Sequence, residues 1–283
     1  LYTVSFFVIS HCLKFKQWLL DVFLATGMIA CIIGIGHFFR YDPIGFKNGI
    51  SPYEYPMFVS TIGNINTYTS YVALISAIAA VLFSIEKNKY KRIWYLFTVI
   101  ISLFALITGM SDNAYLTLMA LFGLLPLYLF NSLDGFKKYM VLVSILFSEF
   151  QFIDTISHKF SNHVLEINGL FNVIVEYDRL PYFVIGLWGI CIILYILKAC
   201  IKKENVLNRV SNIGRWIWLC IIVLVVLAGC YILYDANIAG NTDKYGSLSG
   251  YLVINDDWGT RRGYIWRIGM ESYSKFPEIH KIF

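Results

Sequence analysis

Seven long apolar segments constrain the fold of this chain more than any other feature of its sequence. A membrane-spanning helix needs roughly 20 mostly apolar residues, because it must cover about 30 Å at about 1.5 Å per residue. Backbone groups in lipid must also be paired within the segment, which favours helices. The segments are residues 18–36, 68–85, 93–108, 114–130, 139–153, 182–198 and 216–234. We therefore predict an all-α fold, a polytopic transmembrane helix bundle with about seven spans.

The composition excludes the main soluble classes of protein. Charged residues make up 14% of the 283 residues, against about 25% in a typical soluble domain. With 58% hydrophobic residues, the chain is also too apolar for a disordered protein. The six cysteines lie in or beside apolar segments without a CxxC spacing, which favours buried side chains over a metal or redox site. The net charge of +5 is small and unevenly placed, which argues against nucleic-acid binding.

Basic residues fall mainly in alternate gaps between the predicted spans. One set of gaps holds 13 lysines and arginines, and the positive-inside rule makes this set cytoplasmic. The other short gaps hold only Arg40, Lys47, Lys159 and Arg179. The N-terminus is then cytoplasmic, residues 37–67 form an outer loop, and residues 235–283 begin a large extracytoplasmic loop. We predict one membrane domain over residues 1–283. Because the chain starts at Leu1 without Met and ends inside an apparent motif, we expect it to be a fragment.

Two asparagines stand at the predicted start of the second span. They belong to the sequence Gly63-Asn64-Ile65-Asn66, directly before an apolar run. Asparagine is a favoured residue at the start of a helix, so helix capping is one interpretation. The alternative is that the side-chain amides of Asn64 and Asn66 bind sugar hydroxyls at the outer surface of the membrane.

A short polar turn separates the third and fourth predicted spans. It reads Thr108-Gly109-Met110-Ser111-Asp112-Asn113. This sequence fits a helical hairpin with a capping residue. An acid between two membrane helices can instead order a cation or act as a base, which makes Asp112 a candidate site residue.

The densest polar cluster follows the last predicted span. Arg261, Arg262 and Arg267 stand near the beginning of a predicted helix that Thr260 caps and that runs to about Lys275. Apolar residues on this helix make it amphipathic, so we expect it to lie along the outer leaflet. Positive charge at a helix start is unfavourable unless an anion binds there, and arginine can pair with pyrophosphate through two hydrogen bonds. Binding to lipid headgroups is the alternative.

Other polar groups are weaker candidates. The Asp256-Asp257 pair can bind a divalent metal, but such a pair is common, and we predict no metal site. His280, like His158 and His163, lies in a predicted loop, where a single histidine is usually only solvated. The chain contains no P-loop, no GxGxxG after a strand and no HExxH, so we predict no cofactor.

Three of these patterns resemble the O-antigen ligase and O-antigen polymerase superfamily of bacterial inner-membrane proteins. The Gly63-Asn64-Ile65-Asn66 sequence resembles the Gly-Asn-x-Asn start of a membrane helix in that family. The turn from Thr108 to Asn113 falls where the family has a polar turn, usually Ser-Arg, between two hydrophobic helices. The third pattern, Arg262-x-x-x-Trp266 followed by His280-Lys281-Ile282-Phe283, resembles Arg-x-x-x-Trp and His-Pro-Leu-Phe-Gly. The resemblance covers most of the chain from Gly63 onward.

The sequence also departs from the family pattern. Asp112 stands where the family commonly has arginine, which removes one expected phosphate-binding cation. Lys281 stands where proline is usual, and the chain stops at Phe283, before the family glycine and the helices expected beyond it.

The resemblance implies transfer of a glycan from an undecaprenyl-pyrophosphate carrier to a glycan or lipid acceptor at the outer face of the bacterial cytoplasmic membrane. The resemblance does not decide between a polymerase and a ligase, or between a lipopolysaccharide and a capsule as the product. We expect Arg262 to bind the pyrophosphate, with Arg261 or Arg267 as a supplement. His280 is the candidate for orienting or deprotonating the acceptor, and Asp112 is a second candidate base. Asn64 and Asn66 would shape the site, and membrane lipids are the remaining partners.

Two other classes of function compete with this one. A flippase or exporter of lipid-linked sugars predicts charged residues inside the spans, lining a path. Apart from Lys198 at the last position of its span, only Asp21 and Glu149 fall within the predicted spans, and both are expected near span ends, which counts against transport. A non-catalytic membrane scaffold of a polysaccharide complex would tolerate loss of every outer arginine.

Overall fold

The computed structural model describes residues 16–200 and 204–276, together with Val4, Phe7, His11 and Lys14. The chain divides into two compact units, Leu1–Arg215 and Trp216–Phe283, and each is described by itself. Both are built mainly of helices, so the predicted all-α class is confirmed.

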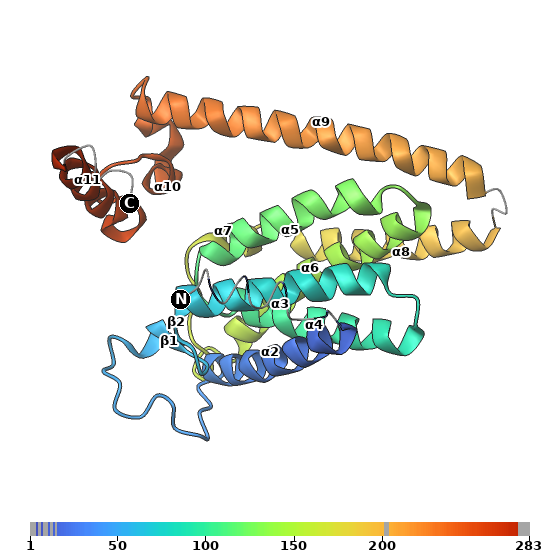
Figure 1. Ribbon diagram of the computed structural model, residues 1–283, viewed down its shortest axis with the longest axis horizontal. Coiled ribbons are helices and arrows are strands. Elements are labelled where there is room, and N and C mark those ends of the chain that lie inside the picture. The colour runs from blue at the N-terminus through green and yellow to red at the C-terminus, as the bar shows by residue number, and fades with distance from the viewer. Residues whose placement is uncertain are drawn as a thin grey trace. The chain divides into compact units, whose positions relative to one another are not determined.

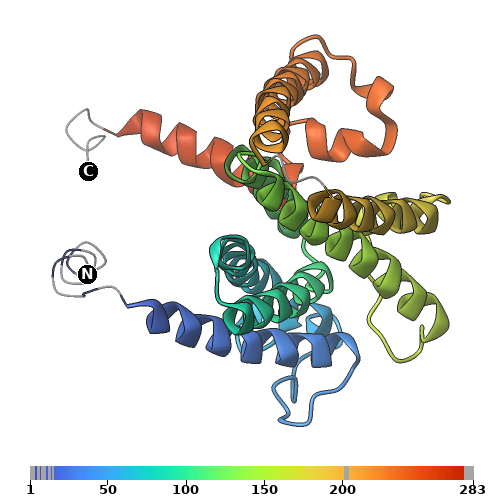
Figure 2. The ribbon, with the colours of Figure 1, turned by 90° about the vertical axis from the view of Figure 1, so that its right-hand side faces the viewer.

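The first unit consists mainly of long helices that run antiparallel to their neighbours (Figure 1). They are α2 (Gln17–Phe38), α3 (Ile65–Ile85), α4 (Lys89–Ile107), α5 (Asn113–Leu129), α6 (Leu133–Lys159), α7 (Leu170–Val175), α8 (Leu180–Cys200) and the beginning of α9 (Glu204–Asn237). The turns are as short as residues 86–88 and 130–132, which forces neighbouring helices to run antiparallel. Figure 2 shows α3 and α4 next to α2.

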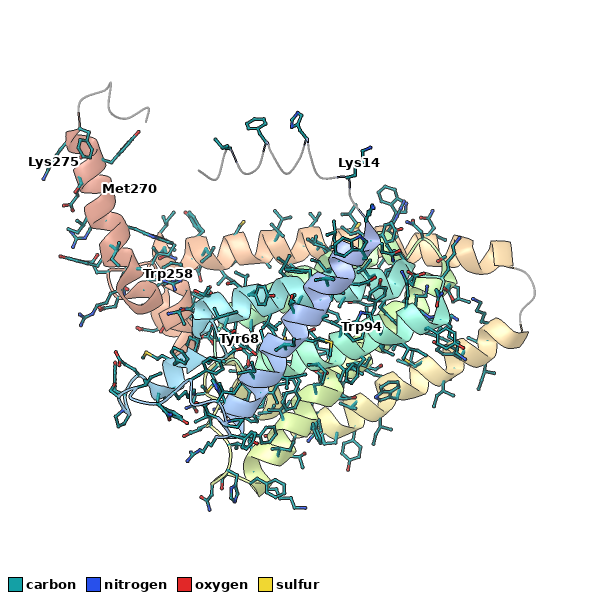
Figure 3. The ribbon with its side chains drawn as sticks, turned by 60° about the horizontal axis from the view of Figure 1, so that its bottom comes forward. Lys14, Tyr68, Trp94, Trp258, Met270 and Lys275 are labelled. Carbon is teal, nitrogen blue, oxygen red and sulfur yellow. The ribbon has the colours of Figure 1, made fainter. Side chains whose placement is uncertain are left out.

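Small residues let α2 and α3 pack closely. A Cβ atom added at Gly34 would overlap the hydroxyl of Tyr68 and lie 2.5 Å from its Cζ atom. At Gly27 the added Cβ would lie 2.7 Å from Cγ1 of Ile75. Tyr68 and Ile75 are both fully buried, and Figure 3 labels Tyr68 beside α2. Membrane helices commonly use small residues in this way, because close backbone approach increases van der Waals contact.

The connection from α2 to α3 carries a small hairpin that was not predicted. After the 3-10 turn η1 (Tyr55–Met57), strands β1 (Phe58–Val59) and β2 (Gly63–Asn64) pair antiparallel. Ser60 in this hairpin is completely buried with a φ of 58°, and its hydroxyl donates to the carbonyl oxygen of Ala30 in α2 at 2.6 Å. The hairpin is therefore fixed against the side of α2.

The two ends of the first unit differ in chemistry. We call the end with β1–β2, residues 108–112 and residues 160–169 the hairpin end. The opposite end, with residues 86–88, residues 130–132 and the side chains of Lys137, Lys138 and Lys198, is the lysine end. Successive loops alternate between these ends, as Figure 1 shows.

Within the described ranges, six helices are long and apolar enough to cross a membrane, which indicates a multi-pass membrane protein. The prediction of seven is not confirmed, because α5 has only 17 residues and carries Pro126 near its end. At about 1.5 Å per residue it is roughly 25 Å long, short of the roughly 30 Å hydrocarbon core. Conversely, the segment predicted over residues 139–153 is the middle of the 27-residue helix α6.

The second unit contains the remainder of α9, η2 (Thr242–Leu248), α10 (Ser249–Leu252) and α11 (Trp258–Lys275). Asp235 organises the turn after α9, since its carboxylate accepts hydrogen bonds from Asn241, Lys244 and Tyr245 at 2.8, 3.2 and 2.6 Å. Asn237 then binds the α10 region, donating to the carbonyl oxygen of Leu252 at 2.8 Å. Figure 3 labels Trp258, Met270 and Lys275 along α11.

Candidate functional site

Asn64 and Asn66 have different roles in the structure. Asn64 is the residue that caps α3, and its side chain accepts hydrogen bonds from the backbone N–H groups of Asn66 and Thr67 at 2.9 and 3.3 Å. The capping interpretation is therefore confirmed for Asn64. Asn66 instead reaches across to the next hairpin, where its Oδ1 atom accepts hydrogen bonds from Ser111 Oγ at 2.7 Å and Asn113 Nδ2 at 3.1 Å.

The turn between α4 and α5 is held tightly against α3. A Cβ atom added at Gly109 would lie 2.6 Å from Cγ2 of Thr69, so a side chain at this position would displace Thr69. Met110 follows with a φ of 55°, in the left-handed region. Asp112 occupies the position before α5 but makes no side-chain capping hydrogen bond, and its side chain is exposed. The structure thus brings Asp112 next to the hydrogen-bonded group of Asn66, Ser111 and Asn113, which we call the asparagine cluster.

A polar cavity of about 420 Å³ opens at the same hairpin end, formed by the end of α6, residues 160–169 and α7. Its polar lining consists mainly of Arg40, Asp154, His158, Glu166, Asn168 and Glu176. Nδ1 of His158 lies 3.1 Å from Oδ1 of Asp154, one helical turn earlier. Carboxylates and amides are good acceptors and donors for hydroxyl groups, so the cavity is chemically suited to a sugar.

Sequence reasoning missed this cavity. It treated His158 as a solvated loop residue, whereas α6 continues through His158 to Lys159 and pairs it with Asp154. The i, i+4 spacing of the two residues was the available signal, but their predicted position was a loop. Arg40 joins the cavity from the α2–α3 connection, since its Nε atom donates to the carbonyl oxygen of Val164 at 3.0 Å.

A second polar group that the sequence did not reveal anchors the α2–α3 connection. The carboxylate of Asp42 accepts hydrogen bonds from the backbone N–H groups of Gly45, Phe46 and Lys47 at 3.0, 3.1 and 2.7 Å. Nε2 of His37 lies 3.5 Å from the same carboxylate, and Nδ1 of His37 accepts from the N–H of Ser60 at 3.0 Å. Burial raises the pKa of Asp42, but the three N–H donors outweigh it and hold that pKa below its usual value.

Lys47 is buried in this connection with its charge poorly solvated. Its ammonium group donates to the carbonyl oxygen of Tyr55 at 3.0 Å and lies 4.1 Å from the centre of the Tyr55 ring. Burial lowers the pKa of Lys47 to about 8, although Asp42 opposes this shift. Lys47 therefore loses its proton at a lower pH than a surface lysine does. Its positive charge is lost under mildly alkaline conditions.

We expect Asp42→Ala to loosen the α2–α3 connection, because three backbone N–H groups lose their acceptor. A loss of roughly 1 kcal/mol of local stability would raise trypsin cleavage at Lys47 about fivefold. Limited proteolysis followed by mass spectrometry measures this, with Glu54→Gln as the control on an exposed carboxylate. Asp42 has a lowered folded-state pKa, so its stabilisation is present above its ordinary pKa of 3.8 and disappears as the pH falls through the lower value. Equal cleavage of both variants at pH 7 would contradict this role.

Glu149 lies deep inside α6, which corrects the prediction that it is near a span end. The helix runs ten residues beyond it to Lys159. Its side chain is only 6% exposed, and neither carboxylate oxygen has a hydrogen-bond partner among the described residues. Asp21, the other predicted intramembrane acid, accepts a hydrogen bond from the hydroxyl of Tyr95 at 2.8 Å. An unpaired carboxylate within a membrane helix is costly, which makes Glu149 a candidate functional residue.

In the second unit, the three predicted arginines lie on α11, but they are not equivalent. Arg267 is bound by Asp256 through two hydrogen bonds, Nε–Oδ1 at 2.9 Å and Nη2–Oδ2 at 2.7 Å, and by Glu271 at 2.9 Å. These carboxylates raise the pKa of Arg267, and the arginine in turn lowers the pKa of Asp256. Within the described ranges, no hydrogen bond or ion pair occupies the exposed side chains of Arg261 and Arg262.

The start of α11 differs from the prediction. The helix begins at Trp258 after Asp257, so Thr260 lies within the first turn and does not cap it. The predicted end at Lys275 is confirmed. Arg261 has a φ of 69°, an unusual left-handed conformation for arginine, so the backbone that carries the arginine pair is locally strained. His280 lies outside the described residues.

Among the described residues, no group of three or more His, Cys, Asp or Glu side chains is placed to hold a metal ion. Asp256, half of the Asp256-Asp257 pair, is instead bound to Arg267. Comparison of the chain with protein-family models, curated proteins and solved structures found no match. The resemblance to the O-antigen ligase and polymerase superfamily therefore stays a hypothesis.

Proposed function

We propose that this protein transfers a glycan from an undecaprenyl-pyrophosphate carrier to a sugar acceptor at the outer face of the bacterial cytoplasmic membrane. The observation that carries this proposal is the asparagine cluster. It joins Asn66 to Ser111 and Asn113, which are 45 and 47 residues away, and so unites two segments that carry the family resemblance. A shared polar site formed from these segments, next to the exposed Asp112, supports a common task.

The availability of Arg261 and Arg262 supports a pyrophosphate-binding role. Carboxylates already neutralise Arg267, so this residue is the weakest of the three candidates. The negative charge on the leaving pyrophosphate grows as the glycosidic bond breaks. A fixed guanidinium group stabilises that charge more strongly in the transition state than in the ground state, which accelerates transfer. We therefore assign stabilisation of the leaving pyrophosphate to Arg262, with Arg261 as a supplement.

The polar cavity gives the acceptor sugar a site in this proposal. Its carboxylates and amides can hold hydroxyl groups, and the Asp154–His158 pair can accept a proton from one of them. Asp112 and His280 are the other candidate bases. The positive-inside rule assigns the lysine end to the cytoplasm, so the hairpin end and this cavity would face outward, where the lipid-linked donor is presented.

Deleting the gene and profiling surface glycans on gels tests the proposal. We expect the long-chain glycan to disappear and to return when the full-length gene is restored. Accumulation of single repeat units on the carrier indicates a polymerase, whereas accumulation of full-length lipid-linked chains indicates a ligase. A deletion strain with an unchanged glycan profile would contradict both activities.

The buried Glu149 favours a second candidate function, export of a lipid-linked sugar. Transporters place ionisable residues inside their spans, and Glu149 has the burial and the unpaired carboxylate expected of such a residue.

Glu149→Gln separates the two functions, with Asp21→Asn as the control. We expect the glutamine variant to retain glycan transfer, because it keeps the shape of the side chain and no described partner requires the charge. Gel profiling of surface glycan in the complemented deletion strain measures this. A loss of glycan in Glu149→Gln, together with retention of carrier-linked sugar on the cytoplasmic side, would favour export.

A further inference from the structure

An apolar groove runs along the surface of the first unit between α3 and α5, with a volume of about 520 Å³. Its lining includes Ala77, Val81 and Ile85 of α3 and Ala120, Leu124 and Tyr128 of α5. Each set repeats every four residues, so each forms one stripe along its helix. Alanine at the beginning of both stripes leaves space between the helices. Leu124 and Tyr128 are 59% and 62% exposed, so the groove is open to the surroundings.

This groove leads into a polar pocket at the lysine end. The pocket has a volume of about 270 Å³ and shares Ile85 and Tyr128 with the groove. Its polar lining consists of Ser84, Asn131, Ser132, Asp134 and Lys138, beside Leu129 and Gly135. The two spaces together form a single site with a long apolar part and a short polar part.

Three lysine side chains gather around Asp134, a carboxylate in the lining of the polar pocket. The carboxylate of Asp134 lies 3.3 Å from the ammonium group of Lys137, 3.0 Å from that of Lys138 and 2.9 Å from that of Lys198. Arg215 adds a fourth cation, since its Nη1 atom donates to Oδ1 of Asn131 at 2.5 Å. Three lysines therefore surround the carboxylate of Asp134, and Arg215 lies beside Asn131, which lines the same pocket.

The nearest acidic residue along α3 does not cancel this excess. Glu86 follows Ile85 in sequence, but Gln17 donates to its carboxylate at 3.1 Å. The backbone N–H groups of Lys87 and Asn88 also donate to it, both at 2.8 Å. The carboxylate of Glu86 is thus bound by groups other than these lysines. The three lysines around Asp134 therefore keep a net positive charge beside the pocket, which is complementary to an anion.

We propose that the groove and pocket together bind one anionic phospholipid from the leaflet at the lysine end. One acyl chain lies between the α3 and α5 stripes, and the phosphate is held by Lys138, Asn131 and Ser132. Asp134 keeps the lysines together, so that the phosphate meets an assembled cationic surface. This site is separate from the proposed glycan site and does not depend on that function. By the positive-inside rule, the leaflet is the cytoplasmic one.

Native mass spectrometry of the full chain, released from nanodiscs of equal phosphatidylglycerol and phosphatidylcholine, tests the proposal. We expect wild-type protein to retain phosphatidylglycerol in preference to phosphatidylcholine. Lys138→Gln removes one phosphate partner and is expected to lower this retention about fivefold, the effect of roughly 1 kcal/mol per basic residue. Ala120→Trp fills the groove and is expected to lower it by a similar factor.

The controls introduce the same new residues outside the site. Lys89→Gln alters an exposed lysine at the same end, and Met119→Trp enlarges a 66% exposed side chain of α5 that does not line the groove. Both should retain phosphatidylglycerol at the wild-type level, and thermal unfolding checks that all variants are folded. The proposal is overturned if phosphatidylcholine is retained equally, or if neither site variant differs from its control. Displacement of phosphatidylglycerol by millimolar inorganic phosphate would also overturn it, since the acyl chain would then contribute nothing.

Discussion

Replacing Arg262 by alanine is expected to lower glycan transfer by roughly 100-fold, the usual effect of removing one group that stabilises a developing negative charge. The effect should be this large because no carboxylate among the described residues competes for the Arg262 guanidinium group. Arg262→Lys keeps a positive charge but loses the two parallel hydrogen bonds, so we expect it to recover only part of the activity.

Arg267→Ala is the matched control, because it removes the same side chain from the same helix. Its guanidinium group is bound to Asp256 and Glu271, so its loss should affect the packing of α11 more than transfer. Each variant is expressed as the full-length protein in the deletion strain. Transferred and carrier-linked glycan are then compared on gels at equal protein levels. Equal activity of the Arg262 and Arg267 variants would remove the pyrophosphate role, and wild-type activity in both would favour a scaffold.

Replacing Gly34 by alanine is expected to destabilise the protein by about 1–3 kcal/mol, the usual cost of overpacking a well-packed core. The added methyl group would overlap the hydroxyl of Tyr68, which is completely buried between α2 and α3. In an unconstrained helix the same change is favourable by about 0.5–1 kcal/mol. A loss of stability in Gly34→Ala would therefore indicate close contact between α2 and α3, whereas a gain would indicate its absence.

Gly186→Ala on α8 provides the control, since no atom lies within 4 Å of the added Cβ. We expect it to be neutral or slightly stabilising. Thermal unfolding of the purified protein in detergent, followed by tryptophan fluorescence, compares the two. Adding Tyr68→Leu should be less harmful in the Gly34→Ala background than in the wild-type protein, because the two positions are coupled. A rise in unfolding temperature for Gly34→Ala would show that α2 and α3 do not pack in this way.

Hydropathy predicted most of the long helices because each contains a long, mostly apolar run. It could not predict where a helix continues into polar sequence. Helix α6 shows this, since it extends beyond residues 139–153 through Asp134 at one end and His158 at the other. The position of Glu149 was misjudged for the same reason.

Contacts between distant segments were also beyond the sequence. Asn64 could be identified as a cap because capping involves only the next few residues. The bonds from Asn66 to Ser111 and Asn113 depend on how α3 crosses the next hairpin. His37 gave no signal, because it stands at the end of an apolar run and its partners, Asp42 and Ser60, are in a loop that has no repeating pattern.

Hydrogen bonds join the α2–α3 connection to the α6–α7 connection at the hairpin end, and this has a consequence for synthesis. The backbone N–H of Leu165 donates to the carbonyl oxygen of Phe38 at 2.9 Å, and Arg40 binds Val164, 124 residues further along the chain. At about 5–20 residues per second, a ribosome needs roughly 6–25 s to add that length. The α2–α3 connection leaves the ribosome before residues 164 and 165 do, so it can reach its final position only after α6 has been made. During that interval its polar groups are exposed to the compartment that receives them, where proteases and folding factors can act on it before the bundle is complete.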